Sequence, residues 1–203
     1  MTEFCAAILA GGKSNRFGQD KAMLSFNGIT LLDRMFNELL SITNDIWVVG
    51  DRREKSVISP DKFLPDIIDN TGPLGGLLTI LSHSSKPILL TPCDMPFLNH
   101  NHMQFLVDEY DSNYDATIAV SKSGIEPLFG FYKPHVKPIV QKCIKSNILA
   151  MYQFINKLDV KCIEFEDQDY NTDMFFNINS FSDYKLAVNL QKKIDLNNPQ
   201  WLR

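Results

Sequence analysis

The sequence predicts an α/β fold, namely a Rossmann-like, open, mostly parallel twisted sheet with helices on both faces and one antiparallel strand. Three observations predict it. Short apolar runs alternate with segments whose apolar residues recur at helical spacing. A glycine-opened loop follows the first apolar run directly, as is typical at the carboxyl edge of such a sheet. Later in the chain, two apolar runs lie too close together for a crossover helix, which predicts the antiparallel strand.

The first half of the chain predicts strands separated by two helices. The expected strands are apolar runs, and they cover 4–9, 46–49, 63–68 and 88–90. Leu32, Met35, Phe36 and Leu39 recur at helical spacing, and Thr30 with Asp33 forms a capping box for that helix. A second helix begins near Pro73 and buries a row of leucines.

The second half continues the alternation. Further strands are expected at 116–120, 128–132, 161–165 and 175–178. Helices are expected at 103–110 and as a pair within 134–158, and a last helix is capped by Ser180 and Asp183. We therefore predict one domain over 1–193 and a C-terminal tail over 194–203.

Composition limits the function classes. The chain has 203 residues, 44% hydrophobic content and a formal net charge of −4, so we expect no general attraction to nucleic acid or anionic lipid. A polyanionic ligand would need a local cationic cluster. No stretch is long enough to cross a bilayer, and the first apolar run ends in glycines, so we expect a cytoplasmic protein that does not bind membranes. A monomer is the default, and the four cysteines are expected to be reduced core thiols.

The loop after the first strand carries the strongest chemical signal. Gly11 and Gly12 let the backbone approach a ligand, so that amide N–H groups can converge on phosphate oxygens. Arg16 and Lys21 add positive charge, and Lys13 is a provisional further contact. The spacing matches neither a Walker A loop nor a G-x-G-x-x-G fingerprint. Taken alone, each cation could equally be a solvated side chain.

A proline-flanked aspartate follows the expected strand at 88–90. Asp94 should lie at the carboxyl edge of the sheet, facing the glycine loop. A carboxylate there would repel a phosphate unless Mg²⁺ bridges the two, and Mg²⁺ commonly uses only one or two protein carboxylates. Asp94 is therefore the expected metal ligand, and a simple turn aspartate is the alternative.

Four motifs give the chain a family resemblance. They are Leu-Ala-Gly-Gly at 9–12, Thr-Gly-Pro-Leu-Gly-Gly-Leu at 71–77, Pro-Cys-Asp-Met-Pro-Phe at 92–97 and Phe-Asn-Ile-Asn at 176–179. In this order they resemble the nucleotidyltransferases that activate cofactors and sugars, and the first motif is most similar to that of molybdenum cofactor guanylyltransferases. The resemblance implies a nucleotide-diphospho-sugar transferase-like fold and a nucleotidyltransferase enzyme.

The resemblance also implies a reaction. GMP would pass from GTP to the terminal phosphate of molybdopterin (Mo-molybdopterin), pyrophosphate would leave, and molybdopterin guanine dinucleotide would form. The attacking oxygen is already anionic, so alignment and charge neutralisation are expected to suffice without a general base. Molybdenum-insertion proteins and molybdoenzyme apoproteins would be further partners.

Site residues follow from the resemblance position by position. The implied catalytic residues are Arg16, Lys21 and Asp94, with Asp94 holding Mg²⁺. The implied GTP-binding residues are Leu9, Ala10, Gly11, Gly12, Lys21, Asp66, Asp69, Gly72 and Asp94. Either Asp66 or Asp69 aligns with the family's nucleotide-binding aspartate, and Asp66 is slightly favoured. Gly50 stands where many relatives carry a nucleotide-contacting asparagine.

The late motif and the nucleotide leave alternatives open. Asn177 and Asn179 would border the pterin side of the cleft, or they would simply end a strand before a capped helix. A related enzyme on the same scaffold could use CTP or a sugar-phosphate acceptor. A catalytically silent nucleotide-binding protein is the alternative from another class, although the retained Arg16, Lys21 and Asp94 argue against it.

Overall fold

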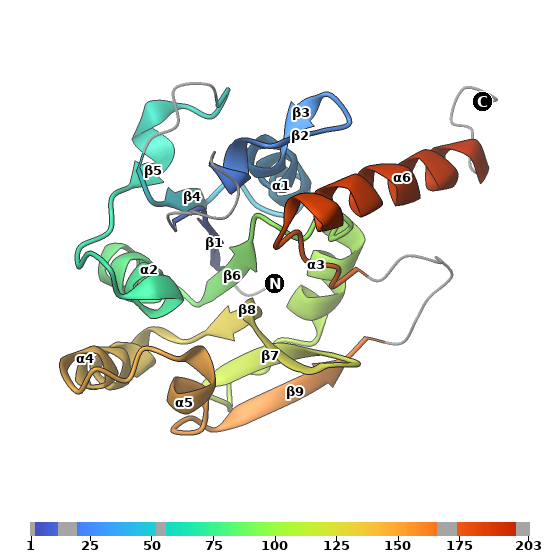
Figure 1. The fold of residues 1–203 in the computed structure, drawn as a ribbon. Helices are drawn as coiled ribbons and strands as arrows, with labels where there is room; N and C mark the ends of the chain where they lie inside the picture. The colour runs from blue at the N-terminus through green and yellow to red at the C-terminus, as the bar shows by residue number, and fades with distance from the viewer. Residues whose placement is uncertain (1–2, 12–19, 52–55, 166–173, 198–203) are drawn as a thin grey trace.

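One twisted sheet forms the centre of the molecule (Figure 1). The computed structural model describes residues 3–11, 20–51, 56–165 and 174–197. Within these residues, seven strands pair in the order β5-β4-β1-β6-β8-β7-β9. The strands are β1 Cys5–Leu9, β4 Ile46–Val49, β5 Phe63–Leu64, β6 Ile88–Pro92, β7 Ala116–Ser121, β8 Gly124–Tyr132 and β9 Val160–Glu164.

Strand direction confirms the predicted α/β class. The strands β5, β4, β1 and β6 pair in parallel, and β7 pairs in parallel with β9. The strand β8 is antiparallel to both of its neighbours. It follows β7 through a tight turn, because too few residues separate the two strands for a helix to cross the sheet. The carboxyl ends of the parallel strands therefore share one edge, where ligands bind in such sheets.

Helices cover both faces of the sheet. They are α1 Leu31–Leu40, α2 Gly72–His83, α3 His100–Asp108, α4 Lys137–Lys145, α5 Met151–Ile155 and α6 Phe181–Asn197, with short 3₁₀ turns η1 Lys21–Met23, η2 Pro60–Lys62 and η3 Pro134–Val136. Successive strand residues point to opposite faces. Ala6 and Ile8 accordingly pack with α1 and α3, whereas Cys5 and Ala7 pack with α2, α4 and α5.

A third apolar cluster ties the C-terminal helix to the N-terminal third of the chain. A hairpin of β2 Ser25–Phe26 and β3 Ile29–Thr30 contributes Phe26, and α6 contributes Ala187. Phe97 and the fully buried Ile178 complete this contact. The cluster places residues 174–179 beside the end of β6, where Ile178 N donates to the backbone oxygen of Asp94 at 3.0 Å.

Close approach explains a glycine within α2. A Cβ built on Gly76 would lie 2.7 Å from Leu9 Cδ2, so only glycine lets this helix pack so tightly over the end of β1. The first turn of α2 therefore lies near the carboxyl edge of the sheet. Its N-cap residue Thr71 makes no side-chain capping bond and instead donates to Ile68 O at 2.8 Å.

Two predicted strands are wrong in extent or type. The strand expected at 63–68 ends at Leu64, because Pro65 has no N–H and Ile67 N donates to Thr79 Oγ1 instead. The segment 175–178 is not a strand. The aromatic residues of this segment pack against the core clusters and do not extend the sheet.

The predicted helix ends agree only in part with the structure. The Thr30 cap is confirmed, since its hydroxyl accepts from Asp33 N at 3.0 Å and donates to Asp33 Oδ2 at 2.6 Å. Asp33 Oδ1 accepts from Ser56 Oγ and Val57 N. Helix α6 continues beyond residue 193, where the tail was expected to begin, because Ile194 still packs on the third cluster.

The cysteines and the helix lengths were also predicted from the sequence. Three of the cysteines are buried as expected, whereas Cys162 is exposed. Among the described residues, no helix has the length and apolarity needed to span a membrane.

Candidate functional site

The turn after β1 lies against two other segments at the carboxyl edge of the sheet. Ala10 N donates to Val49 O at 3.0 Å, which extends the β1–β4 pairing past Leu9. Gly50 has φ +130°, and a Cβ built there would lie 3.2 Å from Gly11 N. The backbone of Gly50 thus lies close to the turn, with no space for a side chain, at the position where the resemblance led us to expect an asparagine.

Three of the residues predicted for this loop are not among those that the structure describes. Gly12, Lys13 and Arg16, which the sequence predicts to bind phosphate, lie outside the described residues. The described part of the site begins again at Asp20, whose carboxylate accepts from Ala22 N at 3.1 Å and caps η1. This cap fixes the start of η1 and so the position of Lys21.

Lys21 and Asp94 form an ion pair across the site. Lys21 Nζ lies 2.5 Å from Asp94 Oδ2, and the two side chains are only 17% and 20% exposed. Asp94 follows β6 directly, as predicted from the proline that ends the strand. The structure thus brings together two of the three residues that the sequence assigns to catalysis.

The same ammonium group contacts both asparagines of the late motif. Lys21 Nζ donates to Asn177 Oδ1 at 3.4 Å and to Asn179 Oδ1 at 3.2 Å. These residues flank the buried Ile178, whose N–H holds the backbone of Asp94. The four predicted residues therefore form one cluster, although they come from three distant parts of the chain.

One oxygen of this cluster has no hydrogen-bond partner among the described residues. Asp94 Oδ1 is buried and accepts no hydrogen bond from any described residue. An orphaned buried carboxylate oxygen is costly, and in native proteins it commonly marks the place of a ligand or ion. A divalent cation fits this oxygen, because Mg²⁺ prefers carboxylate ligands and accepts one or two from the protein.

A metal at Asp94 would need ligands from elsewhere. In the described part of the chain, no group of three or more His, Cys, Asp or Glu side chains is placed to hold an ion. Substrate phosphate oxygens and water commonly complete the octahedron of Mg²⁺ at nucleotide sites. The donor set therefore fits a cation that arrives with a phosphate ligand better than a permanently bound one.

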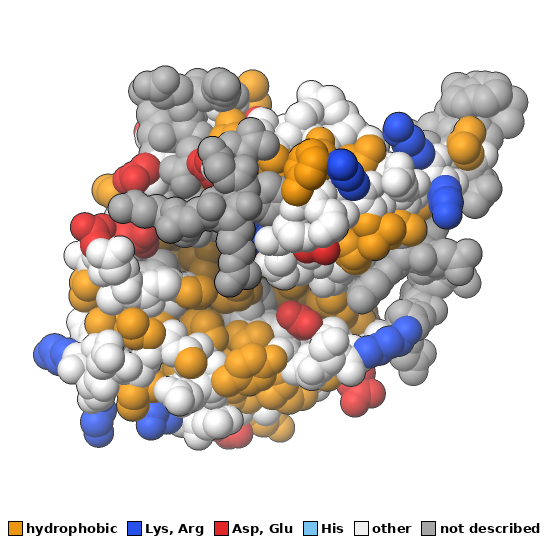
Figure 2. All heavy atoms as spheres, viewed as in Figure 1, with side chains coloured by type: hydrophobic (Ala, Val, Ile, Leu, Met, Phe, Trp, Pro, Cys, Tyr) orange, Lys and Arg blue, Asp and Glu red, His pale blue; other side chains and the backbone are white. Residues whose placement is uncertain are grey.

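Asp51, Asp66 and Asp69 form an acidic rim on the other side of the glycine turn. A Cβ built on Gly11 would lie 3.4 Å from Asp66 Oδ2. Desolvation, with repulsion from Asp51 and Asp69, raises the pKa of Asp66 above its usual range. Figure 2 shows acidic side chains on the rim near β5, above a hollow whose floor is largely hydrophobic.

Helix α2 begins beside this rim. Gly72, a predicted nucleotide contact, is its first residue and has φ +62°, a conformation that glycine adopts without strain. Asp69 is exposed a short distance before it. The predicted nucleotide-binding residues Leu9, Ala10, Gly11, Asp66 and Gly72 thus all lie in segments at this edge of the sheet.

Cys93 is adjacent to the site but is unsuited to nucleophilic chemistry. Burial and the neighbouring Asp94 carboxylate raise the pKa of its thiol to about 12. The thiol therefore stays protonated near neutral pH, and the thiolate is the form that attacks. This arrangement favours direct transfer between substrates over a covalent enzyme intermediate.

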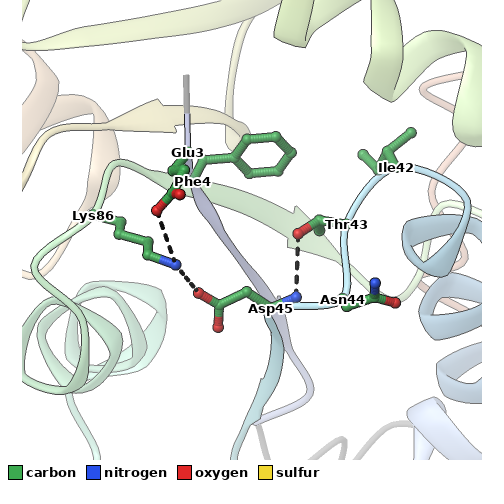
Figure 3. A pocket seen from close by; sticks show the side chains of 7 residues that line it. All are labelled: Glu3, Phe4, Ile42, Thr43, Asn44, Asp45 and Lys86. Carbon is green, nitrogen blue, oxygen red and sulfur yellow. Dashed lines mark hydrogen bonds and ion pairs between the residues drawn. The ribbon is translucent and has the colours of Figure 1, made fainter. Parts of the chain in front are cut away.

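A separate pocket of about 350 Å³ lies at the opposite edge of the sheet (Figure 3). It opens beside the start of β1 and β4, whereas the cluster around Asp94 lies past their ends. Lys86 in this pocket lies 2.9 Å from Asp45 and 3.8 Å from Glu3. The pocket is thus distinct from the candidate site.

The sequence did not indicate that Asn177 and Asn179 contact Lys21. It offered a place on the pterin side of the cleft or a plain strand end, and the structure places both amide oxygens on the Lys21 ammonium. The pattern Asn-x-Asn puts two amides on the same side of an extended segment, and this was the available signal. Without the fold, nothing indicated which cation they would meet.

Comparison with known proteins gives three findings. Residues 6–160 match the family model described as "MobA-like NTP transferase domain". A Carboxydothermus hydrogenoformans protein named "Probable molybdenum cofactor guanylyltransferase" is 30% identical over 94% of this chain and 98% of its own length. A Bacillus cereus protein of the same name is 28% identical over 98% of this chain and its full length.

Solved structures share the fold. The chain is similar to molybdopterin-guanine dinucleotide biosynthesis protein A from Archaeoglobus fulgidus, with a TM-score of 0.79 and 22% identity over 93% of this chain and 98% of that one. It is also similar to 2-C-methyl-D-erythritol 4-phosphate cytidylyltransferase from Thermus thermophilus, with a TM-score of 0.66 and 14% identity over 95% and 100% of the two chains.

Proposed function

The chain belongs to the family of MobA-like NTP transferase domains and is a nucleotidyltransferase; from this premise we propose that it transfers GMP from GTP to the terminal phosphate of molybdopterin. A phosphate oxygen of molybdopterin forms a bond to the α-phosphorus of GTP. The bond between the α- and β-phosphates breaks, and pyrophosphate leaves with the electron pair. The product is molybdopterin guanine dinucleotide.

The observation that carries the proposal is the pairing of Lys21 with a half-satisfied Asp94. An ammonium and a carboxylate with an open oxygen lie together beside a glycine turn, at the edge where α/β sheets bind nucleotides. The cation suits phosphate oxygens, and the open oxygen suits a metal that accompanies them.

The residues divide the work by charge. Asp94 would hold Mg²⁺, which when bound withdraws charge from the phosphate oxygens. Lys21 neutralises charge that develops on the phosphates, and Arg16 is proposed to do the same from the first loop. The backbone of Gly11 is proposed to orient the nucleotide at close range, because glycine carries no side chain of its own.

Guanine selection is proposed to rest on the acidic rim. Guanine presents a ring N–H and an amino group as neighbouring donors, and a carboxylate can accept both. Asp66 is the better placed candidate, because its carboxylate lies next to Gly11. Cytosine presents a ring acceptor in place of the ring N–H, so the same carboxylate would repel it.

Pyrophosphate release tests the function directly. The protein is incubated with Mg²⁺, molybdopterin and each nucleoside triphosphate in turn, and GTP should give the fastest release. Preference for CTP, or turnover only with a sugar phosphate as acceptor, would replace the proposal with a related transferase. Binding of GTP without release under any condition would indicate a silent nucleotide-binding protein.

A further inference from the structure

The ammonium of Lys21 has used all of its hydrogen-bonding capacity. It carries three N–H donors and no acceptor. Among the described residues its three acceptors are Asp94 Oδ2 at 2.5 Å, Asn177 Oδ1 at 3.4 Å and Asn179 Oδ1 at 3.2 Å. A phosphate oxygen can therefore bind Lys21 only by replacing one of these three partners.

The two asparagines are fixed in place by their backbone. Ile178 between them is fully buried, and its N–H donates to Asp94 O at 3.0 Å. Asn179 N donates to Asp183 Oδ2 at 2.9 Å, at the start of α6. An amide group turned by 180° would direct N–H donors at an ammonium, so the oxygens must face Lys21. The asparagines thus form a built acceptor site for a cationic head group.

Asp94 is the partner that must change. A divalent cation at its open oxygen would lie close to the ammonium that binds the other oxygen, and like charges at such a distance repel. The neutral amides carry no net charge and so have no reason to release Lys21 when the cation binds. If the cation replaces Lys21 at Asp94, the repulsion between the two is relieved. One N–H of Lys21 is then free to bind a phosphate oxygen.

We infer that Asn177 and Asn179 are positioning residues for Lys21: they retain its ammonium when a divalent cation takes Asp94, and the released N–H then binds a phosphate oxygen. The inference rests on the proposed function only in taking the ligand to be a metal–polyphosphate. It assigns the asparagines to the phosphate side of the reaction, in contrast to the pterin side expected from the sequence.

A double-mutant cycle with inorganic tripolyphosphate and Mg²⁺ tests the positioning role by calorimetry. In the otherwise unaltered protein, Asn179→Ala should weaken binding about tenfold, as expected for the misplacement of one charge-assisted hydrogen bond. In a Lys21→Met background the same change should cost less than about twofold, because the group it positions is gone. Equal losses in both backgrounds, or no loss in either, would overturn the inference.

The probe separates this inference from the proposed function. Tripolyphosphate has neither base nor pterin, so a result with it stands whether the substrate is GTP or CTP. Asn44→Ala, an exposed asparagine at the far pocket, is the matched control and should change nothing. Thermal unfolding checks that each variant folds, and Lys21→Gln replaces Lys21→Met if the latter does not.

Metal binding without nucleotide gives a second readout of opposite sign. Lys21→Met should bind Mn²⁺ alone about three- to tenfold more tightly than the unaltered protein, because Asp94 loses its competing cation. The same variant should bind tripolyphosphate more weakly. Unchanged or weaker Mn²⁺ binding, measured by electron paramagnetic resonance, would show that Lys21 and the metal do not compete, and would overturn the exchange.

Discussion

The two edges of the sheet each carry a lysine–aspartate ion pair, and among the described residues only the aspartate at the amino edge has a partner for both oxygens. At the amino edge, Asp45 accepts from Lys86 Nζ at 2.9 Å through one oxygen and from Trp47 Nε1 at 3.0 Å through the other. At the carboxyl edge, Asp94 accepts from Lys21 through one oxygen, and its other oxygen is buried with no described partner. Both pairs join a lysine to an aspartate, but among the described residues the second aspartate oxygen has a hydrogen-bond partner only at the amino edge.

This difference indicates which pair serves function. A carboxylate whose oxygens each have a protein hydrogen-bond partner needs no ligand to satisfy them, so a structural role accounts for it. A buried carboxylate oxygen without a hydrogen-bond partner is unfavourable in free energy, and a bound cation removes that cost. The presence of an ion pair or of a pocket is therefore less informative than the hydrogen-bonding capacity that remains at each group.

Removing the charge of Asp94 should have the largest effect. Asp94→Asn keeps the size of the side chain but deprives Mg²⁺ of its carboxylate, so Mg²⁺-dependent pyrophosphate release should fall by at least about a thousandfold. Folding should remain intact, as judged by thermal unfolding. The matched change Asp45→Asn should leave turnover within about twofold. If both variants lost activity equally, the contrast between the two edges would fail.

The acidic rim should show the next largest effect. Asp66→Asn removes the acceptor proposed for the guanine donors and should lower the preference for GTP over CTP by about ten- to a hundredfold, as for one charged hydrogen bond. Asp69→Asn is the control, since it removes a neighbouring charge and should change selectivity much less. Competition kinetics with both nucleotides measures the ratio. A larger effect of Asp69→Asn would reverse the assignment.

Gly50 tests the glycine turn itself. Gly50→Ala places a Cβ at φ +130° and 3.2 Å from Gly11 N, and should cost about 1–3 kcal/mol of stability as well as weaken triphosphate binding. Gly124→Ala is a matched control, because it has φ +119° with no atom within 4 Å of the added Cβ. Denaturant unfolding should show a loss in both variants. Weaker triphosphate binding should appear only in Gly50→Ala.

The amino-edge pair should have the smallest effect. Asp45→Asn should reduce stability by less than about 1 kcal/mol, because an ion pair this exposed is largely screened. Added salt should shrink the difference further. Chemical denaturation at low and high salt measures it. A loss of several kcal/mol would mean that this pair contributes far more than its exposure allows.

The pH dependence of that small effect has a definite sign. Although desolvation acts in the opposite direction, hydrogen bonds from Lys86 and Trp47 lower the pKa of Asp45 in the folded protein. Its stabilisation is therefore present above the unfolded pKa of about 4 and is lost as the pH falls through the lower folded value. The difference between the unaltered protein and Asp45→Asn should be present at pH 7 and vanish in acid.

Much of the fold could be predicted because it depends on local pattern. The run at 88–90 and the proline at 92 indicate a buried strand that ends before Asp94, and the structure confirms this. The failures have a physical cause. The aromatic residues at 175–176 suggest a strand, but their side chains instead pack against helices and loops that lie far away in the chain.

The site divides in the same way. Lys21 and Asp94 each follow a readable local motif, so the sequence could predict that they would meet. The contact between Lys21 and Asn177 joins residues separated by 156 positions, and no local period encodes it. The open oxygen of Asp94 depends on how all the neighbouring groups are satisfied, which only the folded structure reveals.

The return of residues 174–179 to the end of β6 bears on how the site comes into being during synthesis. The strands from β1 to β9 all precede Asn177 and Asn179 in the chain, so they leave the ribosome before the asparagines do. While residues 177–179 are still inside the ribosome, the sheet and the acidic rim can be outside it, and Lys21 would have Asp94 as its sole partner from the cluster. The order of synthesis therefore delays a finished site until residues 177–179 have emerged and returned to the end of β6.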